Sequence, residues 1–248
     1  MENHLYCRNS ASALDARFTL KGSTAAYAPD RTFDTEHIRL DLTLDIGRES
    51  LAGRCTTRLK AITAGANEMK FDAVNLKIRR VRWNNRQASH DHKGGVLTVQ
   101  APTPAKAGET VDVAIEYSVS KPKLGLYFIK PNGKYRKRPT QVWTQGEDEY
   151  ARYWFPCHDA PQDRTTTEVV ITVPTGYTAV SNGQLLKTSN NNRNRTATFH
   201  WRQDVPHATY LVTLAVGKFV HLKDKWRDVP VDYYCEKGRE ADTRRALG

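Results

Sequence analysis

The chain has 248 residues, of which 39% are hydrophobic and 26% charged, and its formal net charge is +11. No window approaches about 18 consecutive apolar residues, and the first residues lack the basic and then apolar pattern of a secretory signal, so membrane and secreted proteins are disfavoured. We expect a cytoplasmic protein without membrane contact. The positive charge only weakly favours a nucleic-acid partner, because a piece of a longer protein need not carry the charge of the whole.

Residues 1–33 are mixed and mostly polar, and we expect an extended amino-terminal arm there. Strict alternation then begins, because apolar side chains from Ile38 to Ile46 alternate with polar ones. This period of two predicts a half-buried strand. Gly47 to Ser50 should form a turn, and residues 51–62 should return as a second strand.

Further short apolar runs are separated by turn residues such as Asn84-Asn85, Gly94-Gly95 and Pro174-Thr175-Gly176. We predict strands at 69–71, 76–83, 96–99, 111–119, 169–173, 177–180, 196–201, 209–216 and 229–234. Many short strands with frequent turns indicate an all-β fold, built as a sandwich or as curved sheets. Residues 236–248 change to charged, helix-forming composition, and we predict that a helix begins there.

The four cysteines, Cys7, Cys55, Cys157 and Cys235, are scattered singly and form no CxxC pair. Isolated thiols without a signal peptide indicate a reducing compartment. We expect all four to be small buried side chains rather than reactive groups.

No complete catalytic motif is present in the sequence. A zinc-protease helix carries HExxH, so that two histidines face one metal, and none of the eight histidines stands in such a motif. His90 and His92 are close together, but the polar residues around them predict a solvated loop. Cys157 and His158 are sequence neighbours, which does not indicate a nucleophile and its base.

One segment carries a dense family signature, namely Thr144 to Pro161, which reads TQGEDEYARYWFPCHDAP. It resembles the corresponding segment of the M1 family of zinc aminopeptidases in ten ordered positions. These are Thr144, Gln145, Glu147, Ala151, Arg152, Phe155, Pro156, Cys157, Asp159 and Pro161. Weaker matches lie at 124–127, 179–183, 210–211 and 217–219, so that the resemblance covers about residues 34–235.

The resemblance implies a large curved β-sheet or β-sandwich domain of the M1 amino-terminal type at 34–235. It also implies that residues 236–248 are the truncated start of a helix-containing catalytic domain. That domain of the family holds the HExxH helix and the zinc, so we expect zinc in the parent enzyme but neither a zinc site nor activity in this piece. The expected partners are the missing catalytic domain and peptide substrates.

The resemblance places the residue that grips the free α-amino group of the substrate at Glu147. An amino terminus differs from an internal peptide by its cation, which a carboxylate binds with a charge-assisted hydrogen bond. Gln145 lies two residues earlier, on the same face if the segment is extended, and is expected to line the first side-chain pocket. Without the resemblance, Glu147 with its acidic neighbours Asp148 and Glu149 would be interpreted as a solvated turn.

Other residues of the segment are expected to be structural. Arg152 and Asp159 are predicted to form an ion pair that holds the loop, and residues 153–155 are predicted to pack in the core or between domains.

The basic run Lys130 to Arg138, KPNGKYRKR, is expected to be an exposed loop, although cations around a tyrosine are also typical of nucleic-acid binding. A rival hypothesis is therefore a catalytically inactive M1-like scaffold or a nucleic-acid-associated interaction domain. The intact Thr144-Gln145-x-Glu147 pattern favours the enzyme, and nucleic acid is the less favoured partner.

Overall fold

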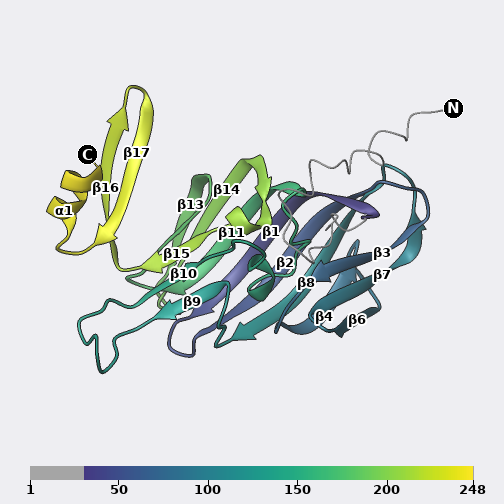
Figure 1. Cartoon of the computed structure of the whole chain (residues 1–248), viewed down its shortest axis with the longest axis horizontal. Helices are drawn as coiled ribbons and strands as arrows, with labels where there is room; N and C mark the ends of the chain where they lie inside the picture. Colours follow the sequence, from purple (N-terminus) through teal and green to yellow (C-terminus); the bar gives the residue numbers. More distant parts are fainter. Residues whose placement is uncertain (1–30, 248) are drawn as a thin grey trace, which may run out of the picture. The chain divides into compact units, whose positions relative to one another are not determined.

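A computed structural model of the chain describes residues 31–247. The expected amino-terminal arm, residues 1–33, lies almost entirely outside that range, as does Cys7. Between residues 31 and 247 the chain forms seventeen strands in four sheets, two 3-10 helices and one α-helix (Figure 1). The prediction of an all-β fold is therefore confirmed.

The largest sheet has eight strands in the order β13-β14-β11-β1-β2-β8-β4-β5. Strand β1 pairs in parallel with β11 and antiparallel with β2, so these strands lie side by side (Figure 1). The bounds are β1 Phe33–Asp45, β2 Ser50–Ala61, β4 Lys77–Trp83, β5 Arg86–Gln87, β8 Thr110–Ser120, β11 Arg164–Pro174, β13 Gln184–Asn191 and β14 Thr196–Ala208.

Three smaller sheets have the orders β12-β15-β10-β9, β3-β7-β6 and β16-β17. Their bounds are β3 Ala66–Asp72, β6 His90–Lys93, β7 Val96–Ala105, β9 Leu126–Ile129, β10 Gln141–Thr144, β12 Thr178–Ser181, β15 Leu214–Gly217, β16 Phe219–Trp226 and β17 Val229–Glu236. The two 3-10 helices span Ala151–Tyr153 and Thr209–Leu211, and α1 spans Glu240–Leu247.

The alternation in β1 places one face of the large sheet in the core. Ile38, Leu40 and Leu42 are at most 3% exposed, whereas Arg39 and Asp41 between them are half-buried on the opposite face. Buried side chains of the eight-, four- and three-stranded sheets form a single hydrophobic cluster. Since burial of apolar surface is the main favourable term in folding, this shared core fixes the three sheets together.

Two predictions of local structure were wrong. Residues 90–93 form strand β6 rather than a loop, because His90 to Lys93 pair with β7, and His92 Nε2 lies 2.7 Å from the Ala73 carbonyl oxygen. The expected strand at 209–216 begins as a 3-10 helix, and only Leu214–Gly217 is extended. A tertiary contact explains this difference, since the Thr209 hydroxyl donates a 2.8 Å hydrogen bond to Asp159 Oδ1.

The predicted carboxy-terminal helix is confirmed as α1, which follows the β16-β17 hairpin. Within residues 31–247 this hairpin pairs with no other sheet, and its Tyr233 hydroxyl donates to the Leu247 carbonyl oxygen at 2.8 Å. No helix in the described range has the length and apolar character needed to cross a membrane.

Burial raises the pKa of two of the cysteine thiols. Cys55, Cys157 and Cys235 are free and buried, as predicted. Removal from water raises the pKa of the Cys55 thiol to about 12 and that of Cys157 well above its usual value. The unfolded chain therefore loses thiol protons at about pH 9, which the folded chain still holds.

We expect native Cys55 and Cys157 to resist a disulfide-exchange thiol reagent at about pH 8 and to react once urea unfolds the chain. The free energy of unfolding should fall as the pH rises above about 9, because only the unfolded state releases these protons. Comparison of the wild type with the double variant Cys55→Ala/Cys157→Ala identifies how much of the thiol reaction and of the pH dependence comes from these two residues. Rapid reaction of both thiols in the native protein would contradict their burial.

Candidate functional site

The predicted substrate-binding residues lie just beyond the end of strand β10. This strand is held on both sides, by β9 and by β15. The chain then passes Gln145, whose backbone N–H donates to the Gly125 carbonyl oxygen at 3.0 Å, and turns at residues 147–150. The Tyr150 N–H closes this turn on the Gly146 carbonyl oxygen at 2.7 Å. Both Gln145 and Glu147 are exposed.

The expectation that Gln145 and Glu147 share the face of an extended segment needs correction. Glu147 begins a turn, so the alternation of a strand does not determine the relative direction of the two side chains. The structure places both residues on one short connection at the edge of the four-stranded sheet.

Gly146 lets this connection lie against the segment that carries Tyr210. A Cβ atom at residue 146 would lie 2.3 Å from the Tyr210 carbonyl oxygen and 2.8 Å from its carbonyl carbon. Those atoms are backbone and cannot rotate away. Gly146 is therefore a positioning residue for the turn, although its φ angle alone does not require glycine.

We expect Gly146→Ala to lower the free energy of unfolding by about 1–3 kcal/mol, because a methyl group is forced into closely packed backbone. Thermal or urea unfolding of the purified chain measures this. Gly133→Ala is the matched control, since its Cβ would meet nothing within 4 Å. Equal stability of the two variants would contradict the close approach at Tyr210.

Arg152 and Asp159 form the predicted ion pair. Arg152 Nε lies 3.2 Å from Asp159 Oδ2, and the Arg152 backbone N–H donates to the same oxygen at 3.1 Å. The guanidinium also pairs with Asp72 at 3.6 Å and with Glu149 at 2.8 Å. Glu149, an acidic neighbour of Glu147 in the sequence, is thus a partner of Arg152.

Asp159 joins three segments that are far apart in the sequence. Its side chain is 1% exposed and accepts a 2.8 Å hydrogen bond from the Thr209 hydroxyl. Its backbone N–H donates to Asp72 Oδ2 at 3.0 Å. Asp72 and Cys157 also exchange backbone hydrogen bonds of 2.7 and 3.2 Å. The acidic turn is therefore anchored to strand β3 and to the 3-10 helix Thr209–Leu211.

Buried aromatic side chains follow the turn directly and pack in the core, as the sequence predicts. Trp154 and Phe155 are fully buried, with ring centroids 4.6 Å apart, and the Tyr117 hydroxyl donates to the Trp154 carbonyl oxygen at 2.9 Å. Tyr153 is half-buried. A charged group on this turn is thus backed by buried, hydrogen-bonded residues, the kind of support that recognition at a fixed position requires.

The three carboxylates of the turn differ in whether they form an ion pair. Glu149 is bound to Arg152, whereas Glu147 and Asp148 make no ion pair or side-chain hydrogen bond with residues 31–247. The role of Glu147 stays a prediction; the sequence did not indicate that Asp72, Thr209 and Tyr210 contact its turn, although 210–211 is among the weaker family matches. Gly146 stands inside the recognised segment and was also missed, although a glycine beside a candidate ligand is a usable signal.

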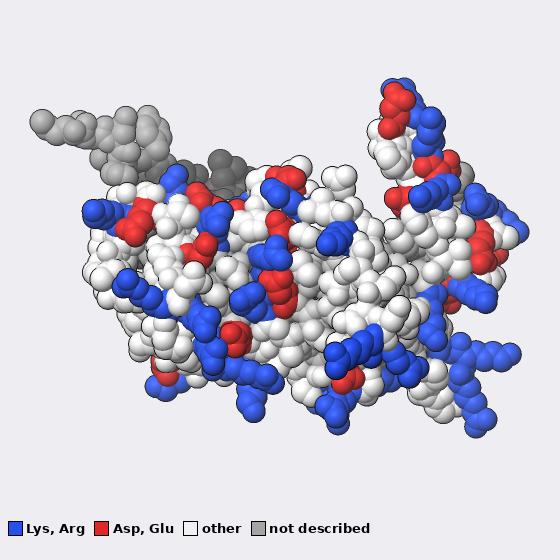
Figure 2. Space-filling view, turned by 180° about the vertical axis from the view of Figure 1, so that it is seen from behind, with Lys and Arg blue, Asp and Glu red and all other residues white. Residues whose placement is uncertain are grey.

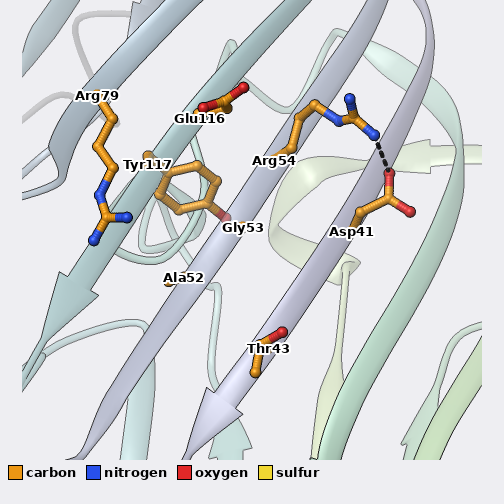
Figure 3. A pocket seen from close by; sticks show the side chains of 8 residues that line it. All are labelled: Asp41, Thr43, Ala52, Gly53, Arg54, Arg79, Glu116 and Tyr117. Carbon is orange, nitrogen blue, oxygen red and sulfur yellow. Dashed lines mark ion pairs between the residues drawn. The ribbon is translucent and has the colours of Figure 1, made fainter.

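The described residues contain no group of three His, Cys, Asp or Glu side chains that could hold a metal ion. A shallow hollow of about 430 Å³ lies on the outer face of the large sheet, beside the ion pair of Asp41 and Arg54 at 3.9 Å (Figure 3). Small residues such as Ala52 and Gly53 form its floor, and it contains no nucleophile paired with a base.

These observations define a β-rich domain that presents exposed carboxylates, Glu147 and Asp148, on an anchored turn, and whose described part contains no group of residues that could hold a metal ion. Residues 34–211 match the family described as Peptidase M1 N-terminal domain. The chain belongs to this family, and the predicted resemblance is confirmed.

Relatives of two kinds are similar to this chain. Transcription initiation factor TFIID subunit 2 of Gallus gallus is 27% identical over 233 residues, which cover 77% of this chain and 20% of that protein. Aminopeptidase B of Mus musculus is 26% identical over 233 residues, covering 84% of this chain and 34% of that protein. The chain thus spans between a fifth and about a third of these two relatives.

The fold is similar to that of a solved M1 zinc metallopeptidase from Deinococcus radiodurans. The TM-score is 0.69 at 23% sequence identity, over 87% of this chain and 52% of that one. At this identity the likeness concerns the fold.

Proposed function

We propose that this chain is the amino-terminal β domain of a longer M1 zinc aminopeptidase, and that Glu147 binds the α-amino group of its peptide substrate. The expected division into an arm at 1–33, a β domain at 34–235 and the start of a catalytic domain at 236–248 is part of this proposal, as is a cytoplasmic location. The observation that carries the role of Glu147 is its place in the family segment Thr144 to Pro161, on a turn that Arg152 and Asp159 anchor. Its carboxylate, like that of Asp148, has no ion-pair partner among residues 31–247.

The chemistry of an amino terminus suits this carboxylate. An α-amino group titrates near pH 8 and is largely a cation at neutral pH, whereas an internal peptide nitrogen is neutral. A carboxylate binds that cation with a charge-assisted hydrogen bond, which is about twice as strong as a neutral one. Because the turn is rigid, the amino group is held at one position, and this position limits cleavage to the first residue.

Zinc, when bound to such an enzyme, polarises the scissile carbonyl and activates a water molecule. The resemblance to the M1 family assigns the zinc ligands of such an enzyme to a catalytic domain that carries HExxH, a motif that this sequence does not contain. The part of this chain is to bind and orient the substrate. Gln145, exposed beside Glu147, supplies an amide that we assign to the first side-chain pocket.

The test is zinc-dependent hydrolysis of amino-acid aryl amides by the longer protein. We expect activity that a chelator removes and added zinc restores, together with an HExxH motif in the longer sequence. The 248-residue chain alone should release no aryl amine. Zinc-dependent release by this chain alone, or loss of HExxH from an otherwise complete protein, would refute the proposal.

A second candidate is a non-catalytic scaffold, which the similarity to transcription initiation factor TFIID subunit 2 favours. The two candidates make opposite predictions for the longer protein. An M1 enzyme keeps the zinc motif and hydrolyses aryl amides, whereas a scaffold keeps the β domain and hydrolyses none.

A further inference from the structure

The connection between β9 and β10 contains the basic run Lys130 to Arg138, here called the basic loop. It holds five Lys or Arg residues and no Asp or Glu. As predicted, it is exposed. Figure 2 shows Lys and Arg side chains projecting at the lower right, where this connection lies when the view of Figure 1 is reversed.

The basic loop has a defined conformation. Lys130 fixes its first end, because Nζ lies 2.9 Å from Glu49 Oε1 and donates to the Gly47 carbonyl oxygen at 3.1 Å. Asn132 Oδ1 then accepts hydrogen bonds from the backbone N–H groups of Lys134 at 3.1 Å and Tyr135 at 2.8 Å. The remaining cations are therefore displayed from a hydrogen-bonded turn.

Four cations of the basic loop lack a counter-charge. Lys134, Arg136, Lys137 and Arg138 are exposed and make no ion pair with any carboxylate in the described range. On strands β1, β2 and β14 of the large sheet, by contrast, Arg39, Arg58 and Arg202 each pair with Asp or Glu. Like charges held close together repel one another, and a ligand with several carboxylates relieves this repulsion.

The aromatic rings near the basic loop already have partners, although Tyr135 and Trp143 remain 47% and 39% exposed. Lys134 Nζ lies 5.3 Å and Arg138 Cζ 4.7 Å from the centroid of the Tyr135 ring. Trp143 on β10 is stacked on Tyr127 with centroids 4.8 Å apart. Single-stranded nucleic acid relies on free aromatic faces for base stacking, whereas a carboxylate requires only the cations. The one carboxylate that the loop does contact, Glu49, is bound in this way.

We propose that the basic loop is a binding site for an extended, acidic peptide segment, whose carboxylates pair with Lys134, Arg136, Lys137 and Arg138. This site is independent of Glu147 and of any peptidase activity. It lies at the start of β10, and the four residues of that strand separate it from the acidic turn by roughly 10 Å or more.

Fluorescence anisotropy with the 248-residue chain tests the proposal. The probes are a fluorescein-labelled peptide of alternating Glu and Ser, its Gln-Ser counterpart, and single-stranded oligouridine of the same length. We expect the Glu-Ser peptide to bind best, and its affinity to fall by about tenfold or more when NaCl rises from about 50 mM to about 500 mM. No measurable binding, or tighter binding of oligouridine, overturns the proposal.

Two variants with the same loss of charge locate the site. Replacing Lys134, Arg136, Lys137 and Arg138 with Gln should weaken binding of the Glu-Ser peptide by about tenfold or more. Replacing Lys77, Arg79, Arg82 and Arg86, on β4 and β5, with Gln should change it by less than about twofold. Equal losses would mean that bulk charge binds the peptide, which overturns the proposal.

A smaller change keeps the test valid if the fourfold loop variant fails to fold. Arg136→Gln with Lys137→Gln alters two side chains that make no ion pair or hydrogen bond in the described structure. It should leave the unfolding midpoint unchanged and still weaken binding by about threefold or more. Unchanged affinity in this variant overturns the proposal.

Discussion

In the longer enzyme proposed above, Glu147→Ala should lower kcat/KM on amino-acid aryl amides by about ten- to a hundredfold. A hydrogen bond to a charged group contributes about 1.5–3 kcal/mol. Its loss raises the free energy of the transition state, because the amino group must stay in place during the reaction. The measurement is kcat/KM at neutral pH for the wild type and the variant. Glu147→Gln should fall between them, since an amide accepts a hydrogen bond without a charge.

Asp148→Ala is the matched control for Glu147. It removes a neighbouring exposed carboxylate from the same turn and should change kcat/KM by less than about threefold. The unfolding midpoint of Glu147→Ala should equal that of the wild type, because its side chain has no ion-pair partner in residues 31–247. If kcat/KM of Glu147→Ala is unchanged, the assigned role is wrong.

Asp159→Ala should lower the free energy of unfolding by about 3–5 kcal/mol. The substitution removes the most buried of the three carboxylates around Arg152, and the remaining two, Asp72 and Glu149, compensate its charge less completely. In this protein the change also frees the Thr209 hydroxyl and the backbone N–H of Arg152, both of which donate to this carboxylate. Urea unfolding of the 248-residue chain, monitored by tryptophan fluorescence, measures the loss.

Asp242→Ala provides the surface comparison for Asp159. Asp242 pairs with Arg239 at 2.8 Å, but the two side chains are 55% and 68% exposed. Such a pair contributes at most about 1 kcal/mol, because water screens it. A loss at Asp159 no larger than that at Asp242 would show that the network around Arg152 does not hold the turn.

The strands that the sequence predicts well are those with one buried face. In β1 and β8, alternate residues are buried, and this pattern is visible directly in the sequence. Strand β13 was not predicted, because all eight of its residues are exposed and pairing with β14 alone makes it extended. Strand β6 is similar, since its residues are polar and, among residues 31–247, it pairs only with β7.

The sequence predicts only the part of the candidate site whose residues lie in one continuous stretch of the chain. The run from Thr144 to Pro161 contains Glu147, Arg152 and Asp159, and their relation follows from one stretch of sequence. Asp72 and Thr209 join the same network from 87 and 50 residues away. No local pattern marks them, because their role arises only when β3 and the 3-10 helix Thr209–Leu211 fold against the turn.

The most direct test of the central claim is an experimental structure of the longer protein with a peptide or amino acid bound through its free amino terminus. We predict that a Glu147 carboxylate oxygen lies about 2.7–2.9 Å from the α-amino nitrogen, the distance of a charge-assisted hydrogen bond. An amino terminus held by other carboxylates, with Glu147 directed into solvent, would contradict the proposed function of this domain.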